Sequence, residues 1–257
     1  MEKNDVLRIE NLNVSFGETL VFRDFSIDLP KDKITCVLGP SGAGKTTLLK
    51  ALCGLIPPKN GFIPPKCSFI FQDHRLLPNL TALDNLAVVL DGKRAERRKQ
   101  AGKMLSDMEL SDAANLYPDE LSGGMAQRVA IARGLLFSGD LLLMDEPFKG
   151  LDLGLQERLI KYFVKHWEAN PRTTVFVTHS ILEAILVADR IVILEKPIKE
   201  ASEANPDSLK EKSGDSAGQG ARILYEKEFS MPREARALGV PEVDALRSQI
   251  HDILVEL

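Results

Sequence analysis

Residues 39–47 read Gly39-Pro40-Ser41-Gly42-Ala43-Gly44-Lys45-Thr46-Thr47, and the rest of the chain is organised around them. The run fits the pattern G-x-x-x-x-G-K-[ST] at every fixed position. An apolar run at 34–38 precedes it as a predicted buried strand, and residues 46–52 follow it with helical character. In this context successive backbone N–H groups point at a phosphate chain, and the start of the helix adds the positive end of its dipole. The sequence therefore predicts a nucleotide site of the P-loop kind.

Two side chains of this loop have predicted tasks. Lys45 is expected to reach the outer phosphates of the nucleotide. The hydroxyl of Thr46 is expected to bind the Mg²⁺ ion that bridges those phosphates, because Mg²⁺ prefers oxygen donors. Thr47 is expected to pack or to cap the helix. The residues assigned to ATP in the loop are Gly39, Pro40, Ser41, Gly42, Ala43, Gly44, Lys45, Thr46 and Thr47.

The composition is that of an ordinary globular protein. The 257 residues are 44% hydrophobic and 27% charged, and their formal net charge of −4 argues against a nucleic-acid binder held by phosphate contacts. The three cysteines are predicted to be buried reduced thiols, which indicates a cytosolic compartment. No signal core opens the chain and no stretch approaches about eighteen uninterrupted apolar residues, so any role at a membrane is predicted to be peripheral.

Strand and helix patterns alternate along most of the chain. Apolar residues alternate with polar ones before the loop, which predicts half-buried antiparallel strands at 6–10, 12–16 and 25–29. The predicted buried strands span 34–38, 68–71, 141–144, 174–178 and 190–194. The predicted helices span 46–52, 83–90, 93–108, 125–137, 155–168 and 241–257. This order predicts an α/β fold in which helices cover a mostly parallel sheet.

The sequence also predicts how the chain is divided into domains. A main domain is expected at 1–198, with an N-terminal antiparallel β subdomain and an inserted helical subdomain at about 73–135. Residues 199–220 hold one large apolar residue among polar ones, which predicts a flexible linker or loop. Residues 221–257 are expected to form a short tail of one strand and one helix.

Two acids follow the buried strand 141–144. Asp145 and Glu146 are therefore placed at the C-terminal edge of a parallel sheet, where ligands bind in such folds. Asp145 is expected to hold the Mg²⁺ shell, and Glu146 to orient or deprotonate the water that attacks the γ-phosphate. The alternative is a strand that ends in a solvated acidic turn, which becomes less favoured downstream of a P-loop.

A second phosphate-binding edge is predicted at Leu121-Ser122-Gly123-Gly124-Met125-Ala126-Gln127-Arg128. Ser122, Gly123 and Gly124 open a helix whose N-terminus can hold an anion. Because the P-loop already cradles one nucleotide, this second edge most simply serves a nucleotide held by another copy of the chain. The pattern therefore suggests a dimer.

At this point the chain resembles the ATP-binding cassette (ABC) ATPases, whose signature is Leu-Ser-Gly-Gly-x-x-Gln-Arg, over roughly residues 5–195. The resemblance implies that Phe16 stacks on adenine and that Gln72 senses Mg²⁺ and the γ-phosphate. It also implies that Asp152 faces the partner subunit. The resemblance assigns Ser122, Gly123, Gly124 and Asp152 to the ATP of the partner and Thr46, Gln72 and Asp145 to the metal.

His179 matches the switch histidine of that family. It ends the predicted strand 174–178 at the sheet edge of Asp145, where an imidazole can donate to a phosphate oxygen. The catalytic residues implied by the resemblance are thus Glu146, His179 and Gln72.

Within the family the chain is similar to the ATPases of nitrate, sulfonate and taurine importers, on residues 72–78, the short helical block and the tail from 229. The resemblance implies an ATP- and Mg²⁺-dependent homodimer in the ATP-bound state, peripheral on the cytoplasmic face of the membrane. It also implies transmembrane permease subunits, seated around 72–85, and an extracytoplasmic solute-binding protein. No nucleic acid is expected as a partner, and the solute stays open.

Two alternatives stay open beside the importer. One is a soluble ABC protein of Fe–S cluster assembly, DNA repair or translation, disfavoured because the chain has neither long coiled coils nor two fused cassettes. The other is a non-hydrolysing cassette, against which Glu146 argues. The chain departs from the family at 199–220, which is longer than expected, and at Asp32, which stands where glycine is usual. A left-handed backbone is therefore expected at Asp32.

Overall fold

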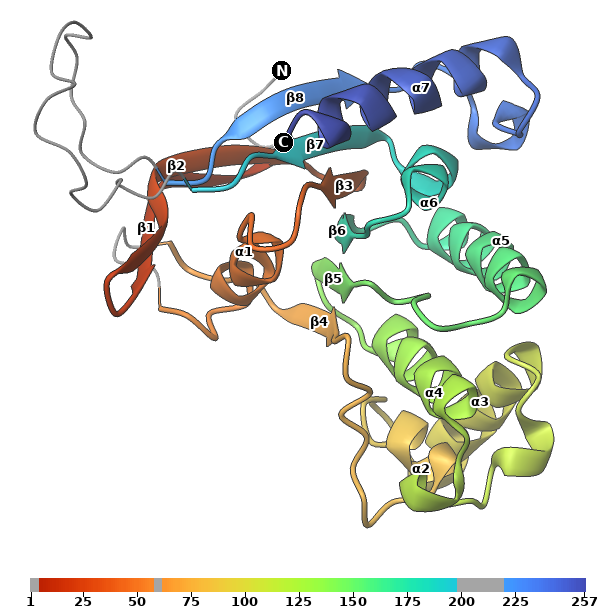
Figure 1. The fold of residues 1–257 in the computed structure, drawn as a ribbon. Coiled ribbons are helices and arrows are strands. Elements are labelled where there is room, and N and C mark those ends of the chain that lie inside the picture. Colours follow the sequence, from red (N-terminus) through yellow and green to blue (C-terminus); the bar gives the residue numbers. More distant parts are fainter. Residues whose placement is uncertain (1–4, 58–61, 198–219) are drawn as a thin grey trace, which may run out of the picture.

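The computed structural model describes residues 5–57, 62–197 and 220–257, which form two sheets and the helices around them (Figure 1). The strands are β1 (Val6–Phe16), β2 (Thr19–Pro30), β3 (Ile34–Leu38), β4 (Cys67–Ile70), β5 (Leu141–Asp145), β6 (Thr173–Val177), β7 (Arg190–Leu194) and β8 (Ile223–Glu228). The α-helices are α1 (Lys45–Leu52), α2 (Ala82–Ala87), α3 (Arg94–Asp107), α4 (Gly123–Leu136), α5 (Leu153–Ala169), α6 (Ile181–Val187) and α7 (Pro241–Val255). Short 3₁₀ helices occur at Ser111–Ala113, Pro118–Glu120 and Arg233–Ala235.

The N-terminal sheet is an antiparallel pair of β1 and β2 that runs from Val6 opposite Pro30 to Phe16 opposite Thr19. The two strands predicted at 6–10 and 12–16 are one strand, so that prediction was wrong in detail. The register shifts between Ile9 and Leu12, and Asn11 at that shift has a left-handed φ of 52°. A bulge of this kind interrupts the apolar alternation without ending the strand.

The second sheet has the strand order β4-β5-β6-β3-β7-β8. All neighbours are parallel except β8, which is antiparallel to β7, so the predicted mostly parallel sheet is confirmed. Every residue of β3, β5, β6 and β7 is buried, as continuous apolar strands covered on both faces require. Because β5, β6 and β3 are neighbours, the loops that follow them meet at one edge of the sheet.

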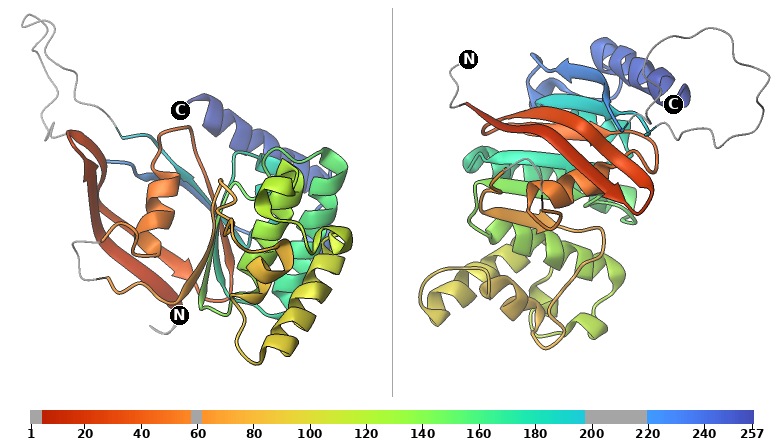
Figure 2. Two further views of the ribbon diagram at one scale, coloured as in Figure 1. Left: turned by 90° about the horizontal axis from the view of Figure 1, so that it is seen from below. Right: turned by 90° about the vertical axis from the view of Figure 1, so that its left-hand side faces the viewer.

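Helices cover both faces of this sheet (Figure 2). On one face α1 lies between the large sheet and the β1–β2 pair, and α4, α5 and α6 lie on the other face. Alternate residues of β3 belong to the apolar clusters on opposite faces of the sheet. Ile34 and Cys36 are part of one cluster, and Val37 is part of the other. In the parts of the chain that are described, no helix combines the length and the apolar character needed to cross a membrane.

Between β4 and β5 the described chain forms no strand, in agreement with the expected helical insertion, whose limits at 73 and 135 stay a prediction. Asn85, which is fully buried in α2, holds the loop that precedes this helix. The Asn85 side chain accepts from the Leu77 N–H and donates to the carbonyls of Leu77, Leu80 and Thr81. A buried amide satisfied in this way fixes the loop that leads into α2.

The tail predicted at 221–257 forms β8 and α7, and α7 packs against α6. Arg236, 5% exposed, donates to the carbonyls of Ile185 and Ala188 at the end of α6. Arg233 pairs with Asp189, whose carboxylate also accepts from the Ile34 N–H of β3. The predicted loop 199–220 lies outside the described residues except for Gly220.

Gly220 lies against the backbone of β2. The Ala221 N–H donates to the Val21 carbonyl at 2.7 Å. A Cβ added to Gly220 would lie 2.4 Å from the backbone nitrogen of Arg23 and 2.9 Å from the carbonyl carbon of Phe22. Backbone atoms cannot yield as a flexible side chain can, so this contact requires glycine.

Gly220→Ala is therefore expected to lower the free energy of unfolding by about 1–3 kcal/mol. Gly102→Ala in α3 is the matched control, because its added Cβ would meet only Leu83 Cδ1 at 3.9 Å. The control is expected to be neutral or to stabilise by up to about 1 kcal/mol. Urea unfolding of both variants measures the difference, and equal stabilities would contradict the close approach of residue 220 to β2.

Candidate nucleotide site

The glycine-rich loop joins β3 to α1, as predicted. At two of its positions the backbone conformation and the close neighbours require glycine. Gly39 has a φ of 144°, and a Cβ there would lie 2.4 Å from the Leu194 carbonyl oxygen of β7. Gly44 has a φ of 88° and precedes the first residue of α1, where a Cβ would lie 2.9 Å from both Phe22 and Val21. Any side chain at either position would be strained, so the loop conformation depends on glycine.

Lys45 begins α1 and points into this loop. Its Nζ donates to the carbonyl oxygens of Gly39 at 2.7 Å and Pro40 at 2.9 Å, and the residue is only 6% exposed. Burial lowers the pKa of Lys45, while the carboxylates of Glu146 and Asp145 act in the opposite direction. The ammonium group is thus held inside the loop beside two acids.

Thr46 and Asp145 meet, although 99 positions separate them in the sequence. The Thr46 hydroxyl donates to Asp145 Oδ2 at 2.8 Å. Asp145 ends β5 and is 4% exposed, and this burial raises the pKa of its carboxyl against the opposing effect of the Thr46 hydrogen bond. The two oxygen ligands predicted for Mg²⁺ therefore lie side by side.

Glu146 follows β5 with a left-handed φ of 48°, which is unfavourable for a residue with a side chain. Its N–H donates to the Val177 carbonyl of β6 at 2.9 Å. Both carboxylate oxygens are engaged, Oε1 with His179 Nε2 at 2.9 Å and Oε2 with Lys149 Nζ at 2.7 Å. Backbone strain of this kind concentrates at functional sites, and here it occurs at the residue whose carboxylate contacts His179.

The register of the sheet explains how His179 reaches Glu146. Val177 of β6 lies opposite Asp145 of β5, so the residues that follow each strand emerge together. Ile70, the last residue of β4, is likewise opposite Met144 of β5, and Gln72 follows two residues later. Gln72 is exposed just beyond the end of β4, and its role toward Mg²⁺ stays a prediction.

The predicted second phosphate edge begins α4, which packs against α2 and α3. The Ser122 side chain caps the helix by accepting from the Met125 N–H at 3.3 Å, and Ser122 and Gly123 are exposed. Gln127, one turn further, is buried and its Nε2 donates to the Pro147 carbonyl at 2.5 Å. This bond joins α4 to the residue after Glu146. Sequence reasoning gave Gln127 no role, although it belongs to the quoted motif.

Phe16 and Asp152 are both exposed. Phe16 ends β1 at the tip of the β1–β2 hairpin with 55% of its surface accessible, which leaves its ring free to stack. Asp152 caps α5, and its Oδ1 accepts from the Leu155 N–H at 2.9 Å. In the described chain neither side chain forms a direct hydrogen bond with Lys45, Asp145, Glu146 or His179.

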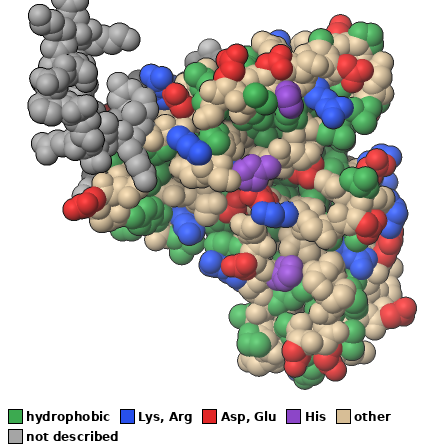
Figure 3. Space-filling model, in the orientation of Figure 1, with side chains coloured by type: hydrophobic (Ala, Val, Ile, Leu, Met, Phe, Trp, Pro, Cys, Tyr) green, Lys and Arg blue, Asp and Glu red, His purple; other side chains and the backbone are tan. Residues whose placement is uncertain are grey.

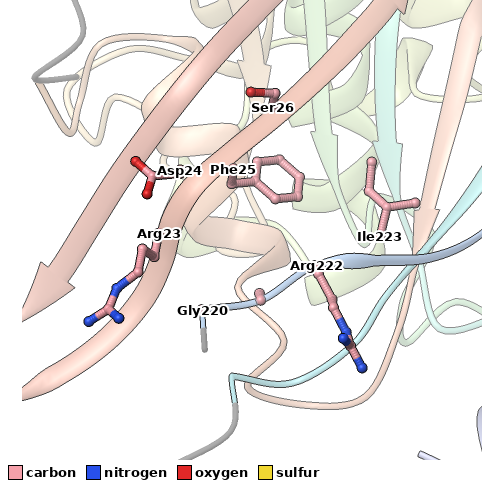
Figure 4. Close-up of a pocket in the computed structure, with 8 residues that line it drawn as sticks. Arg23, Asp24, Phe25, Ser26, Gly220, Arg222 and Ile223 are labelled. Atoms are coloured by element: carbon pink, nitrogen blue, oxygen red, sulfur yellow. The ribbon is translucent and has the colours of Figure 1, made fainter. Parts of the chain in front are cut away.

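A pocket of about 430 Å³ lies elsewhere, beside β2 and the segment that begins at Gly220 (Figure 4). Arg23, Asp24 and Arg222 border it, and it contains none of the residues assigned to nucleotide. On the face shown in Figure 3, acidic and basic side chains lie interspersed, and histidines lie among them. The candidate site is therefore defined by its loop and side chains and not by this pocket.

A buried, mostly parallel sheet, a glycine-rich loop between β3 and α1, and carboxylates at the end of β5 define a class. They are the parts of a P-loop protein that binds a nucleoside triphosphate.

Comparison with known proteins shows to which family of P-loop proteins the chain belongs. The family model described as ABC transporter matches residues 22–149. An aliphatic sulfonates import ATP-binding protein of Streptomyces avermitilis is 40% identical over 194 residues, covering 74% of this chain and 77% of that protein. The sulfate/thiosulfate import ATP-binding protein of Escherichia coli is 38% identical over 223 residues, covering 79% of this chain and 61% of that protein.

A solved structure agrees with these relatives. The dimeric ATP-binding cassette MJ0796, in a post-hydrolysis state bound to ADP and Pi, is similar with a TM-score of 0.65 and 30% identity, over 72% of this chain and 93% of that chain. The chain belongs to the ABC transporter family and is an ATP-binding, ATP-hydrolysing subunit. The resemblance drawn from the signature is thereby confirmed.

Proposed function

We propose that two copies of this chain sandwich two ATP molecules, each between the P-loop of one copy and the signature of the other. The observation that carries this proposal is that Ser122 is exposed and its side chain bonds only to its own helix, at the Met125 N–H, among the described residues. Lys45, Asp145 and Glu146 lie at the edge of the large sheet, whereas Ser122 caps the N-terminus of α4. The dimeric related cassette supports the arrangement.

The residues at the sheet edge fit Mg²⁺. The Thr46 hydroxyl and the Asp145 carboxylate, 2.8 Å apart, are hard oxygen donors, and the Gln72 amide at the end of β4 offers a third. When bound, Mg²⁺ neutralises charge on the β- and γ-phosphates. Lys45 would hold the same phosphates as a cation, and Phe16 would stack on the adenine.

The task of Glu146 follows from its neighbours. Its carboxylate would accept a proton from the attacking water, or orient that water, because a base must lie within hydrogen-bond reach of the proton it takes. His179 Nε2 and Lys149 Nζ hold the two carboxylate oxygens in place. His179 would also donate to the γ-phosphate, since a single imidazole N–H can bridge neighbouring acceptors when they approach.

We propose that ATP hydrolysis by this chain drives the import of a small anion or organic solute. Relatives named as import subunits for sulfonates and for sulfate or thiosulfate support this, and they disfavour a soluble ABC protein. The chain would lie peripherally on the cytoplasmic face of the membrane. Its partners would be transmembrane permease subunits, which would dock around residues 72–85, and an extracytoplasmic solute-binding protein.

Ser122→Arg is expected to leave ATP binding by a single copy within about twofold and to abolish ATP turnover. The serine faces the nucleotide of the other copy in this proposal, so a long cation there would block closure of the sandwich. Equilibrium binding of a fluorescent ATP analogue and steady-state hydrolysis measure the two effects separately.

Ser106→Arg is the matched control, because Ser106 is an exposed residue of α3 outside the signature. It is expected to hydrolyse ATP at the wild-type rate. If Ser122→Arg instead lost ATP binding as a single copy, the signature would serve its own P-loop and the sandwich model would be wrong.

A further inference from the structure

Glu183, in the first turn of α6, is a carboxylate that the proposed mechanism does not use. It is only 6% exposed, and burial raises the pKa of its carboxyl, opposed by hydrogen bonds from Thr178 and Gln156. In the described chain no cation contributes to that pKa shift. A buried carboxylate without a cation is costly, so its contacts call for a physical explanation.

Those contacts enclose the loop that carries His179. The Thr178 hydroxyl donates to Glu183 Oε2 at 2.6 Å, and the same hydroxyl oxygen accepts from the Ser180 N–H at 3.0 Å. The Ser180 hydroxyl in turn accepts from the Glu183 N–H at 3.2 Å. The residues on both sides of His179 are therefore tied to Glu183, and the imidazole is left 46% exposed and bonded to Glu146.

The other oxygen of Glu183 reaches a different helix. Gln156 Nε2, in the first turn of α5, donates to Glu183 Oε1. That turn begins at Asp152, and the Gln156 N–H donates to the Asp152 carbonyl at 2.9 Å. Gln156 thus joins the first turn of α5, to which its backbone belongs, to Glu183, which its side chain contacts, and Glu183 joins the loop of His179.

We propose that Glu183 is a positioning residue that holds His179 against Glu146 and ties the His179 loop to the start of α5. The inference rests on the proposed function, in which His179 takes part in hydrolysis and Asp152 faces the partner copy. Under that function the network lets the position of the α5 start, at the interface of two copies, affect the imidazole beside the attacking water. Networks of this kind act as units because each bond orients the next.

Glu183→Leu removes both side-chain contacts at similar volume. It is expected to lower kcat for ATP hydrolysis roughly 10- to 100-fold, because small displacements of a catalytic group have effects of that size, while the KM for ATP stays within about twofold. Glu183→Gln is expected to recover most of the rate, since its amide can accept from Gln156 while donating to the Thr178 hydroxyl. Glu157→Leu, a change at an exposed neighbour of Gln156, is the matched control and is expected to leave kcat unchanged.

The ring signals of His179 in an NMR spectrum provide a readout that a general loss of stability would not move. The chain has four histidines, so the signal is assigned by His179→Ala. Glu183→Leu is expected to shift and broaden it, and Gln156→Leu to do so to a smaller degree, whereas Glu157→Leu leaves it in place. Should Glu183→Leu fail to fold, Gln156→Leu and Glu183→Gln are compared by the same two measurements.

The outcomes separate this inference from the proposed function. A Glu183→Leu or Gln156→Leu protein whose His179 signal and kcat match the wild type overturns the inference, as does a fall in kcat without any change at His179. A His179→Ala protein that hydrolyses ATP at the wild-type rate overturns the catalytic role of His179 instead, even where Glu183 is found to hold its ring.

Discussion

Glu146→Gln is expected to lower the rate of ATP hydrolysis by about 10²- to 10⁴-fold while ATP binding persists. The amide keeps the shape of the carboxylate and can still accept from His179 Nε2, now 2.9 Å from Oε1, but it cannot take a proton from water. The strained backbone at residue 146, with its φ of 48°, is unchanged by the substitution. Steady-state hydrolysis at saturating ATP and Mg²⁺ measures the rate.

Asp145→Asn is the informative comparison for that variant. It weakens the oxygen pair that Asp145 forms with Thr46, so its defect is expected to ease when Mg²⁺ is raised. The defect of Glu146→Gln is expected to be the same at every Mg²⁺ concentration. A Glu146→Gln enzyme with the wild-type rate, or one rescued by Mg²⁺, would remove the assignment of Glu146 as the base.

Lys45→Ala is expected to weaken ATP binding by on the order of 10- to 100-fold and to abolish hydrolysis with it. A hydrogen bond between charged groups contributes about 1.5–3 kcal/mol, and Lys45 is the cation that lies inside the loop. Lys50→Ala is the matched control, because Lys50 lies in the last turn of the same helix. Equilibrium ATP binding measures both variants, and equal affinities for them would contradict the phosphate role of the loop.

The positions of the candidate site residues in the fold could be predicted from the sequence wherever one local pattern was enough, and their roles stay predictions. The loop at 39–47, the acids after β5 and the serine that opens α4 each follow from a short motif next to a strand or helix. Asp32 has a φ of 52°, as its place in a turn that usually holds glycine predicted. Cys36 is buried as expected, whereas Cys53 and Cys67 are only partly buried.

What the sequence did not predict depends on contacts between distant segments. The left-handed backbone of Glu146, its contact with Lys149 and the bond from Gln127 to Pro147 arise only when β5, α4 and β6 are packed together. The link from Gln156 to Glu183 joins two helices, 27 positions apart, that have no shared motif. In the sequence, polar residues of this kind cannot be distinguished from ordinary surface residues, because only the folded chain brings their partners together.

The ATP sandwich is tested most directly by the mass of the Glu146→Gln protein in solution, measured by size-exclusion chromatography with light scattering. Blocked hydrolysis should keep the sandwich closed, so the account predicts that ATP raises the mass from 28.4 kDa to twice that value. Adding Ser122→Arg to Glu146→Gln should keep the protein at the mass of one chain in ATP. A Glu146→Gln protein that binds ATP and stays at 28.4 kDa, or a double variant that still doubles its mass, would contradict the account.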